Sequence, residues 1–388
     1  MDSLTDLLKK YIKIHNSDRN IENKKYFEKT RSIIINRTRY VPKNLDEIDN
    51  NIPFMYWIDD GMWKYIFNVN LERLYKEPLY YLENWLKCRI FYYENFNDCS
   101  YFDSFIPIWL GLGFETTFFG CRMKYNPDEE PVIDFQHLVL NNYEDLKKLK
   151  IPDFYNNDSM EIAFKFYDEI KNFVSEYGIE AGFFDWNLSP LNLCNYLRGL
   201  LNISLDFKLN KEFVRNLMDF LVACRIDWSK KRDEFLGVKR KNGGQLLNDP
   251  ISVPNLSPDT YSELVFPYEK QIHDFYGSIS YFHSCGPLEQ FLNVMKDFKN
   301  MELLHSGPYT DYKKIFELFG SKSPIELFLP KRDRWEKEDL KNKLIEIKES
   351  SLKFGVKSFL VRYTSFYNPI LGSPMIQWRI QHIFMRNI

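Results

Sequence analysis

Histidine and cysteine are scarce in this chain of 388 residues, which contains six of each. The cysteines lie at positions 88, 99, 121, 194, 224 and 285 and include no Cys-x-x-Cys pair. They are too few for a dense disulfide framework in a chain of this length, so we expect free thiols. Because both residue types are rare, a place where they come together stands out as a candidate site.

A strong net charge and a long apolar run are also missing. The chain has 52 Lys and Arg against 54 Asp and Glu, a formal charge of -2, which gives no field for attracting nucleic acid. Its longest mainly apolar stretch, residues 105–114, is far below the roughly 18 to 20 residues that span a bilayer. The first 16 residues carry apolar side chains at helical spacing between charges, unlike a signal peptide. We therefore expect a cytoplasmic protein with a small-molecule substrate and no nucleic-acid or membrane partner.

Several well-known site motifs are absent from the sequence. It has no GxGxxG or GxxxxGK[ST] phosphate loop, no GxSxG elbow and no HExxH pair, so the usual nucleotide sites and these hydrolase sites have no support. Aromatic residues, in contrast, are abundant, with 33 Phe, 25 Tyr and 8 Trp. A chain that is 44% hydrophobic and 17% aromatic can bury a large core, which excludes a disordered protein.

The pattern of apolar residues changes along the chain. Residues 1–90 resemble helices joined by Asn- and Pro-containing loops, whereas short apolar runs alternate with helical periodicity from about residue 179 onward. Such alternation is typical of βα units with a parallel sheet, and it leaves a closed barrel and an open doubly wound sheet both possible. The clearest predicted strands are at 277–285, 301–305, 325–330 and 358–364.

Two of these predicted strands end in metal-ligand residue types. His283 and Cys285 are two residues apart and therefore project from the same face of a strand, and His305 ends the next one. Imidazole and thiolate suit Zn²⁺, which takes about four tetrahedral ligands and keeps one position open when it is catalytic. The alternative is a buried, inert cysteine beside hydrogen-bonded structural histidines.

Two acidic residues are candidates for a general acid or base. Asp103 stands just before the apolar run at 105–109, and Asp249 follows the apolar run before the helix that Pro258 begins. For both, a helix cap, a turn or an orienting group is the alternative role.

The order of several motifs resembles the uroporphyrinogen decarboxylase superfamily. LSPDTYSELVFPYEKQI followed by FHSCGPLEQFL carries the resemblance, and the HSCG version is similar to the corrinoid-linked, zinc-dependent methyltransferase branch. PLNLCNYLRG at 190–199 and the stretch 119–154 are similar to upstream parts of these proteins. The resemblance implies an α/β fold, a (β/α)₈ TIM-type barrel over residues 91–388, with residues 1–90 as a helical N-terminal extension.

The same resemblance implies a function and a site. His283 and Cys285 match the first two zinc ligands of the methyltransferases, which use the metal to activate a thiol that accepts a methyl group from a corrinoid, here methylcobalamin, on a partner protein. Members of that kind carry a further Cys near the last strand, whereas this chain has none after Cys285 and has RYTSFYN at 362–368 instead. His305 is then the candidate third ligand. We expect Asp249 and Tyr363 at the mouth of the pocket and Trp186 and Arg362 to bind substrate.

Two other functions remain open from the sequence. One is decarboxylation of a porphyrinogen-like substrate without metal, with Asp103 as the acid, although the Arg-rich N-terminal signature of the decarboxylases is missing. The other is a barrel that only binds a small molecule or a corrinoid protein, with catalysis lost along with the later cysteine.

Overall fold

The structure, a computed structural model, describes residues 3–34, 37–58, 60–238, 243–252, 255–329 and 337–364. Its centre is built from parallel strands in two ladders, one of order β3-β12-β11-β10-β9-β8 and one of order β4-β7. A parallel bridge between Leu188 and Leu247 joins the second ladder to the first. The strands are β3 (Phe54–Trp57), β4 (Phe105–Ile108), β7 (Glu180–Phe183), β8 (Gly244–Leu247), β9 (Ile279–His283), β10 (Leu304–Ser306), β11 (Ile325–Phe328) and β12 (Phe359–Thr364).

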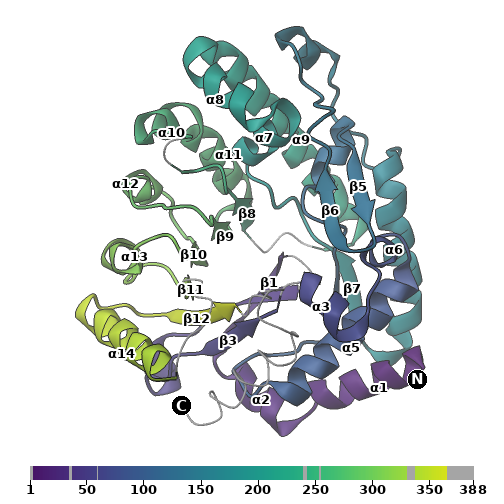
Figure 1. Ribbon diagram of the computed structural model, residues 1–388, viewed down its shortest axis with the longest axis vertical. Coiled ribbons are helices and arrows are strands. Elements are labelled where there is room, and N and C mark those ends of the chain that lie inside the picture. Colours follow the sequence, from purple (N-terminus) through teal and green to yellow (C-terminus); the bar gives the residue numbers. More distant parts are fainter. Residues whose placement is uncertain are drawn as a thin grey trace.

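Helices lie outside these strands and alternate with them along the chain, so the fold is the predicted (β/α)₈ barrel (Figure 1). Ser and Asp side chains cap several of these helices, among them Ser189 before α7 and Asp311 before α13. The helices that follow the barrel strands are α5 (Pro78–Asn95), α6 (Asp158–Val174), α7 (Pro190–Arg198), α8 (Leu200–Leu209), α9 (Lys211–Phe235), α10 (Pro258–Leu264), α11 (Phe266–Tyr276), α12 (Leu292–Met295), α13 (Tyr312–Phe319) and α14 (Lys337–Lys353).

The four strands predicted in the last third of the sequence are confirmed as β9 to β12, each slightly shorter than its apolar run. The helix predicted after β9 is shorter than expected. The apolar spacing after Cys285 suggests a helix as far as Phe298, but only α12 is helical there, and the residues before it form turns. Glu289 in these turns accepts a hydrogen bond from the backbone N–H of Asp311, so this loop is tied to the start of α13.

The expectation that residues 1–90 contain only helices and loops is wrong. This segment includes the antiparallel hairpin β1 (Phe27–Ile34) and β2 (Arg37–Pro42), and β3 pairs in parallel with β12 inside the barrel sheet. The run FMYW suits a strand covered on both faces, because such strands are continuously apolar rather than alternating. The other elements of the segment are α1 (Leu4–His15), α2 (Asp18–Lys24), α3 (Asp60–Phe67) and α4 (Leu71–Leu74).

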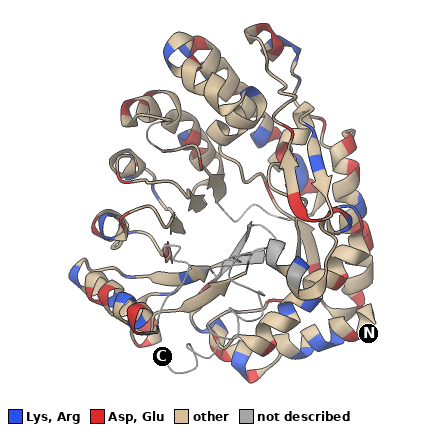
Figure 2. Cartoon of the chain, viewed as in Figure 1, with Lys and Arg blue, Asp and Glu red and all other residues tan. Residues whose placement is uncertain are grey.

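Charged residues of both signs are interspersed over the outer helices, whereas few lie on the central strands (Figure 2). The second hairpin, β5 (Met123–Asn126) and β6 (Glu129–Ile133), also carries charges and stands outside the barrel sheet. Within the described ranges, no helix is both long enough and apolar enough to cross a membrane.

Candidate metal centre

Strand register brings His283 and His305 together inside the barrel. β9 and β10 are parallel and pair Phe282 with Leu304, so the next residues on the two strands, His283 and His305, lie side by side and project from the same face. On the other side of β9, Leu247 of β8 pairs with His283. Their ring centroids are 4.3 Å apart. Both lie at the carboxyl ends of their strands, which is the end of a TIM barrel where active sites form.

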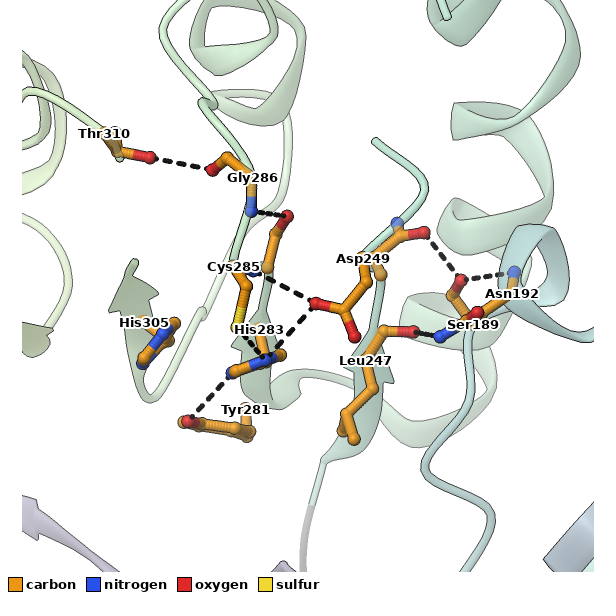
Figure 3. Close-up of polar contacts among 12 residues, drawn as sticks. Ser189, Asn192, Leu247, Asp249, Tyr281, His283, Cys285, Gly286, His305 and Thr310 are labelled. Atoms are coloured by element: carbon orange, nitrogen blue, oxygen red, sulfur yellow. Dashed lines mark hydrogen bonds and ion pairs between the residues drawn. The ribbon is translucent and has the colours of Figure 1, made fainter. Parts of the chain in front are cut away.

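Cys285 completes this group just beyond the end of β9. Its Sγ lies 3.3 Å from Nε2 of His283, and one ligand atom from each of His283, Cys285 and His305 lies within 4.8 Å of the other two (Figure 3). Tetrahedral zinc with bonds of about 2.0 to 2.3 Å needs ligand atoms about 3.5 Å apart, so small side-chain movements suffice to fit the ion. The donor set of two imidazoles and one thiol also suits zinc.

Burial differs among the three residues in a way that suits a reactive centre. His305 is 1% exposed, His283 is half-buried and Cys285 is exposed. Of the six cysteines, Cys285 alone is exposed, and four of the others are buried in the core. The cluster is therefore anchored inside the barrel and open on the cysteine side, where a substrate can approach.

Asp249, two residues after β8, borders the cluster. Its Oδ1 accepts a hydrogen bond of 3.0 Å from the backbone N–H of Cys285 and lies 3.4 Å from Nε2 of His283. Burial by itself raises the pKa of Asp249, but the hydrogen bond and charge of His283 outweigh it and bring the pKa to about 2. Asp249 is thus a carboxylate at neutral pH, and its side chain is 45% exposed, so that substrate can reach it.

The same contacts shift the pKa of His283 in the opposite direction, upward. Burial lowers the pKa of this imidazole, but its interactions with Asp249 and Cys285 outweigh the burial and raise the pKa to about 10. A metal ligand must be a neutral imidazole. Metal binding at Nε2 therefore competes with a proton at this position.

A second layer of polar side chains lies directly below the cluster. Glu326 accepts hydrogen bonds at Oε1 from the Tyr281 hydroxyl at 2.9 Å and from Nδ1 of His305 at 3.2 Å. Its other oxygen, Oε2, pairs with Nε of Arg362 at 2.7 Å. Arg362, a predicted substrate-binding residue, is 2% exposed and belongs to this buried layer.

Tyr281 and Glu326 were not predicted from the sequence. Tyr281 stands two residues before His283 and so projects from the same face of the strand, which is a signal that spacing does contain. Glu326 is a lone carboxylate within the apolar run IELF. A buried acid at such a position requires a partner, and this requirement is the signal that could have identified it.

The predictions for Tyr363 and Trp186 are not supported by their positions. Tyr363 projects from the opposite face of β12 to Arg362 and packs its ring against Tyr56 at 6.1 Å in the core, away from the pocket mouth. Burial raises its pKa to about 12. Trp186 is fully buried and stacks on Phe118 at 5.9 Å, which is a packing role rather than a substrate contact.

Asp103 is placed away from the cluster as well. It precedes β4 and therefore lies at the amino end of a strand, whereas His283 and Asp249 lie at carboxyl ends. Its backbone oxygen accepts a hydrogen bond from the Tyr11 hydroxyl at 2.8 Å, and it lines a small cavity of about 40 Å³ beside α1 and α5. Asp103 thus precedes its strand, as the sequence indicates, and its role as a general acid stays a prediction.

Comparison with known proteins agrees with this architecture. A family model described as uroporphyrinogen decarboxylase (URO-D) matches residues 101–333, which include Asp249 and all three candidate metal ligands. A search among curated proteins gave no match. The family match supports an enzyme of the decarboxylase or methyltransferase type. The chain belongs to the uroporphyrinogen decarboxylase family.

Proposed function

We propose that this protein is a zinc-dependent methyltransferase or demethylase component that moves a methyl group between a corrinoid cofactor and a thiol or methylated small molecule. The observation that carries the proposal is the clustering of His283, Cys285 and His305 with their ligand atoms within 4.8 Å. Two imidazoles and one thiolate supply three protein ligands and leave one position for substrate, as in catalytic zinc sites.

In this proposal, His305 supplies the third ligand in place of the missing later cysteine. The methyltransferases that this chain resembles take a further ligand from near the last strand, and in this chain that segment is RYTSFYN, of which residues 365–368 lie outside the described part. His305 is on β10 and already lies against His283. The proposed centre therefore draws its third ligand from a strand next to β9 instead of from the last strand.

The chemistry divides between the metal and the chain. Zinc bound here would lower the pKa of a substrate thiol, so that the thiolate nucleophile exists at neutral pH. Asp249 is ionised, partly exposed and 3.4 Å from His283, which suits it to orient the substrate at the open side of the cluster. A pKa of about 2 makes it too weak a base to keep the proton that the thiol releases, so that proton passes to solvent. The backbone N–H of Cys285 holds the Asp249 carboxylate in place. The methyl donor is a corrinoid carried by a partner protein.

The alternative of decarboxylation with Asp103 as the acid has less support. Asp103 lies at the amino end of β4, and the cluster that contains Asp249 lies at the carboxyl ends of β8 to β10. Arg362, which pairs with Glu326 below the cluster, also lines the small cavity beside Asp103. A barrel that only binds its ligand is the remaining alternative, and an activity assay separates it from an enzyme.

Methyl transfer from methylcobalamin to a panel of thiols tests the proposal. The full chain with zinc is expected to demethylate the corrinoid in the presence of one class of thiol, followed by the change in cobalamin absorbance. Cys285→Ser should lose this activity, because it removes the thiolate ligand, whereas Cys99→Ser, outside the cluster, should keep it. A zinc-containing protein that transfers no methyl group to any thiol would favour the binding barrel.

A further inference from the structure

Glu326 is the one buried carboxylate that contacts the candidate metal centre from below among the described residues. It is 0% exposed on β11, within the interior of the barrel. Its two oxygens accept hydrogen bonds from Tyr281, His305 and Arg362, which come from three other strands. A carboxylate in this position costs free energy unless hydrogen bonds and a counter-charge compensate, and Arg362 provides that charge.

The contacts of Glu326 decide where His305 carries its proton. A carboxylate only accepts hydrogen bonds, so the bond of 3.2 Å between Oε1 and Nδ1 of His305 requires a proton on Nδ1. In the neutral ring Nε2 is then the nitrogen with the available lone pair. Nε2 is thus the atom that His305 can offer to a metal.

Tyr281 connects Glu326 to His283, so that Glu326 also influences where His283 carries its proton. Its hydroxyl donates to Glu326 at 2.9 Å, which leaves the hydroxyl oxygen as an acceptor, and Nδ1 of His283 lies 3.5 Å from that oxygen. The Nδ1 proton of His283 therefore points at Tyr281. Nε2 points at Sγ of Cys285 and lies 3.4 Å from the Asp249 carboxylate, so it carries a second proton in the metal-free chain, which a bound metal would displace (Figure 3). Both histidines present the same nitrogen to the cluster.

We propose that Glu326 is the positioning residue of this centre. It contacts His305 directly and His283 through Tyr281, and in this way keeps a proton on Nδ1 of each ring. Both Nε2 atoms are then directed toward a shared zinc ion. The inference deepens the proposed function, since it concerns the same cluster. Arg362 holds Glu326 ionised and in place by a charge-assisted hydrogen bond. Carboxylate partners of this kind fix ring orientation and make the imidazole a stronger ligand.

The position of the His305 proton is measured directly by nitrogen-15 NMR of the metal-free full chain, at a pH where the ring is neutral. The expected spectrum shows His305 with its proton on Nδ1. In Glu326→Gln the preference should weaken, because an amide accepts less strongly than a carboxylate. A wild-type His305 that carries its proton on Nε2 would overturn the inference, with no need for any variant to fold.

Zinc affinity, measured by competition with a chromophoric chelator, supplies the second readout. Glu326→Gln should bind zinc about 10- to 100-fold more weakly, the usual loss when such a partner is removed. Glu115→Gln is the matched control, because Glu115 is also a buried, hydrogen-bonded carboxylate but contacts Asn187 and Leu188 rather than the cluster. Unchanged affinity in Glu326→Gln contradicts the inference.

Tyr281→Phe separates the two branches of the network. This variant keeps the direct contact between Glu326 and His305, so His305 should retain its Nδ1 proton, while Nδ1 of His283 loses its contact with the Tyr281 hydroxyl. With Co²⁺ in place of zinc, the visible spectrum should report altered ligand geometry in both Tyr281→Phe and Glu326→Gln. If the wild-type chain bound no metal at all, the proposed function would fail, and the His305 proton position would still decide the role of Glu326.

Discussion

Arg362 and Tyr363 are neighbours in β12 with opposite surroundings. Arg362 projects into the barrel and pairs with Glu326, while Tyr363 projects outward and packs on Tyr56. The alternation of a strand causes this difference, because successive side chains point to opposite faces. The sequence identifies both as residues near a strand end, but it does not tell which of the two faces the interior.

The two residues should therefore respond differently to substitution. Arg362→Met removes the arginine counter-charge of the buried Glu326 and should destabilise the protein by about 3 to 5 kcal/mol. Tyr363→Phe keeps the ring and its packing and should cost no more than about 1 kcal/mol. Urea denaturation of both variants gives the comparison. Equal, small losses would mean that the pair between Arg362 and Glu326 is not a structural requirement.

A chain of buried polar contacts connects β8 to three helices. Asn248, directly after β8, accepts from the Ser189 hydroxyl, which caps α7, and donates to Glu269 of α11. Glu269 also accepts from the Tyr261 hydroxyl of α10 at 2.6 Å. These contacts hold the segment that carries Asp249, so the position of Asp249 depends on helices that lie far from it in sequence.

This network should make stability depend on pH. Burial raises the pKa of Glu269 to about 7 despite its hydrogen bonds from Tyr261 and Asn248, whereas a carboxyl in the unfolded chain titrates near 4.5. The folded state thus binds the proton more tightly, and the free energy of unfolding falls as pH rises from about 4.5 to 7. Glu269→Gln should remove this fall and be more stable at pH 8 by on the order of 2 kcal/mol. A variant less stable than wild type at pH 8 would contradict the assignment.

Predictability from sequence differs between the elements. The strands β9 to β12 stand out because β-branched and aromatic runs are separated by clear helices, and the spacing of His283 and Cys285 places them at a strand end. β3 could not be recognised as a barrel strand, because its partner β12 is about 300 residues away and local pattern carries no information on that pairing. Tyr281 and Glu326 do leave a signal in the sequence, in strand spacing and in an acid within an apolar run, but their contacts with each other and with His305 join different strands and could not be predicted.

The whole molecule depends on β3 for its sheet. β3 pairs with β12 from Val361↔Phe54 to Thr364↔Trp57, and without it that edge of β12 has no partner in the ladder. A fragment covering residues 91–388 lacks this strand together with α1 and most of α5. We expect the fragment to be insoluble or to lack a cooperative thermal transition by circular dichroism, whereas the full chain unfolds cooperatively. A fragment that folds like the full chain would support residues 1–90 as a separate extension.

At the scale of the whole chain, the scarce histidines and cysteines converge on one place. Of twelve such residues, His283, Cys285 and His305 come together at the carboxyl ends of adjacent strands, and this convergence is the basis of the proposed metal centre. The family match covers all three of these residues.

Metal content of the full chain, purified without a histidine tag and measured by elemental analysis, tests the central claim most directly. The account predicts close to one equivalent of zinc in the wild type, and its loss in Cys285→Ser and in His305→Gln. The exposed His137 offers a matched control, so His137→Gln should retain the metal. A wild-type protein that is folded and free of metal even after incubation with zinc would contradict the account.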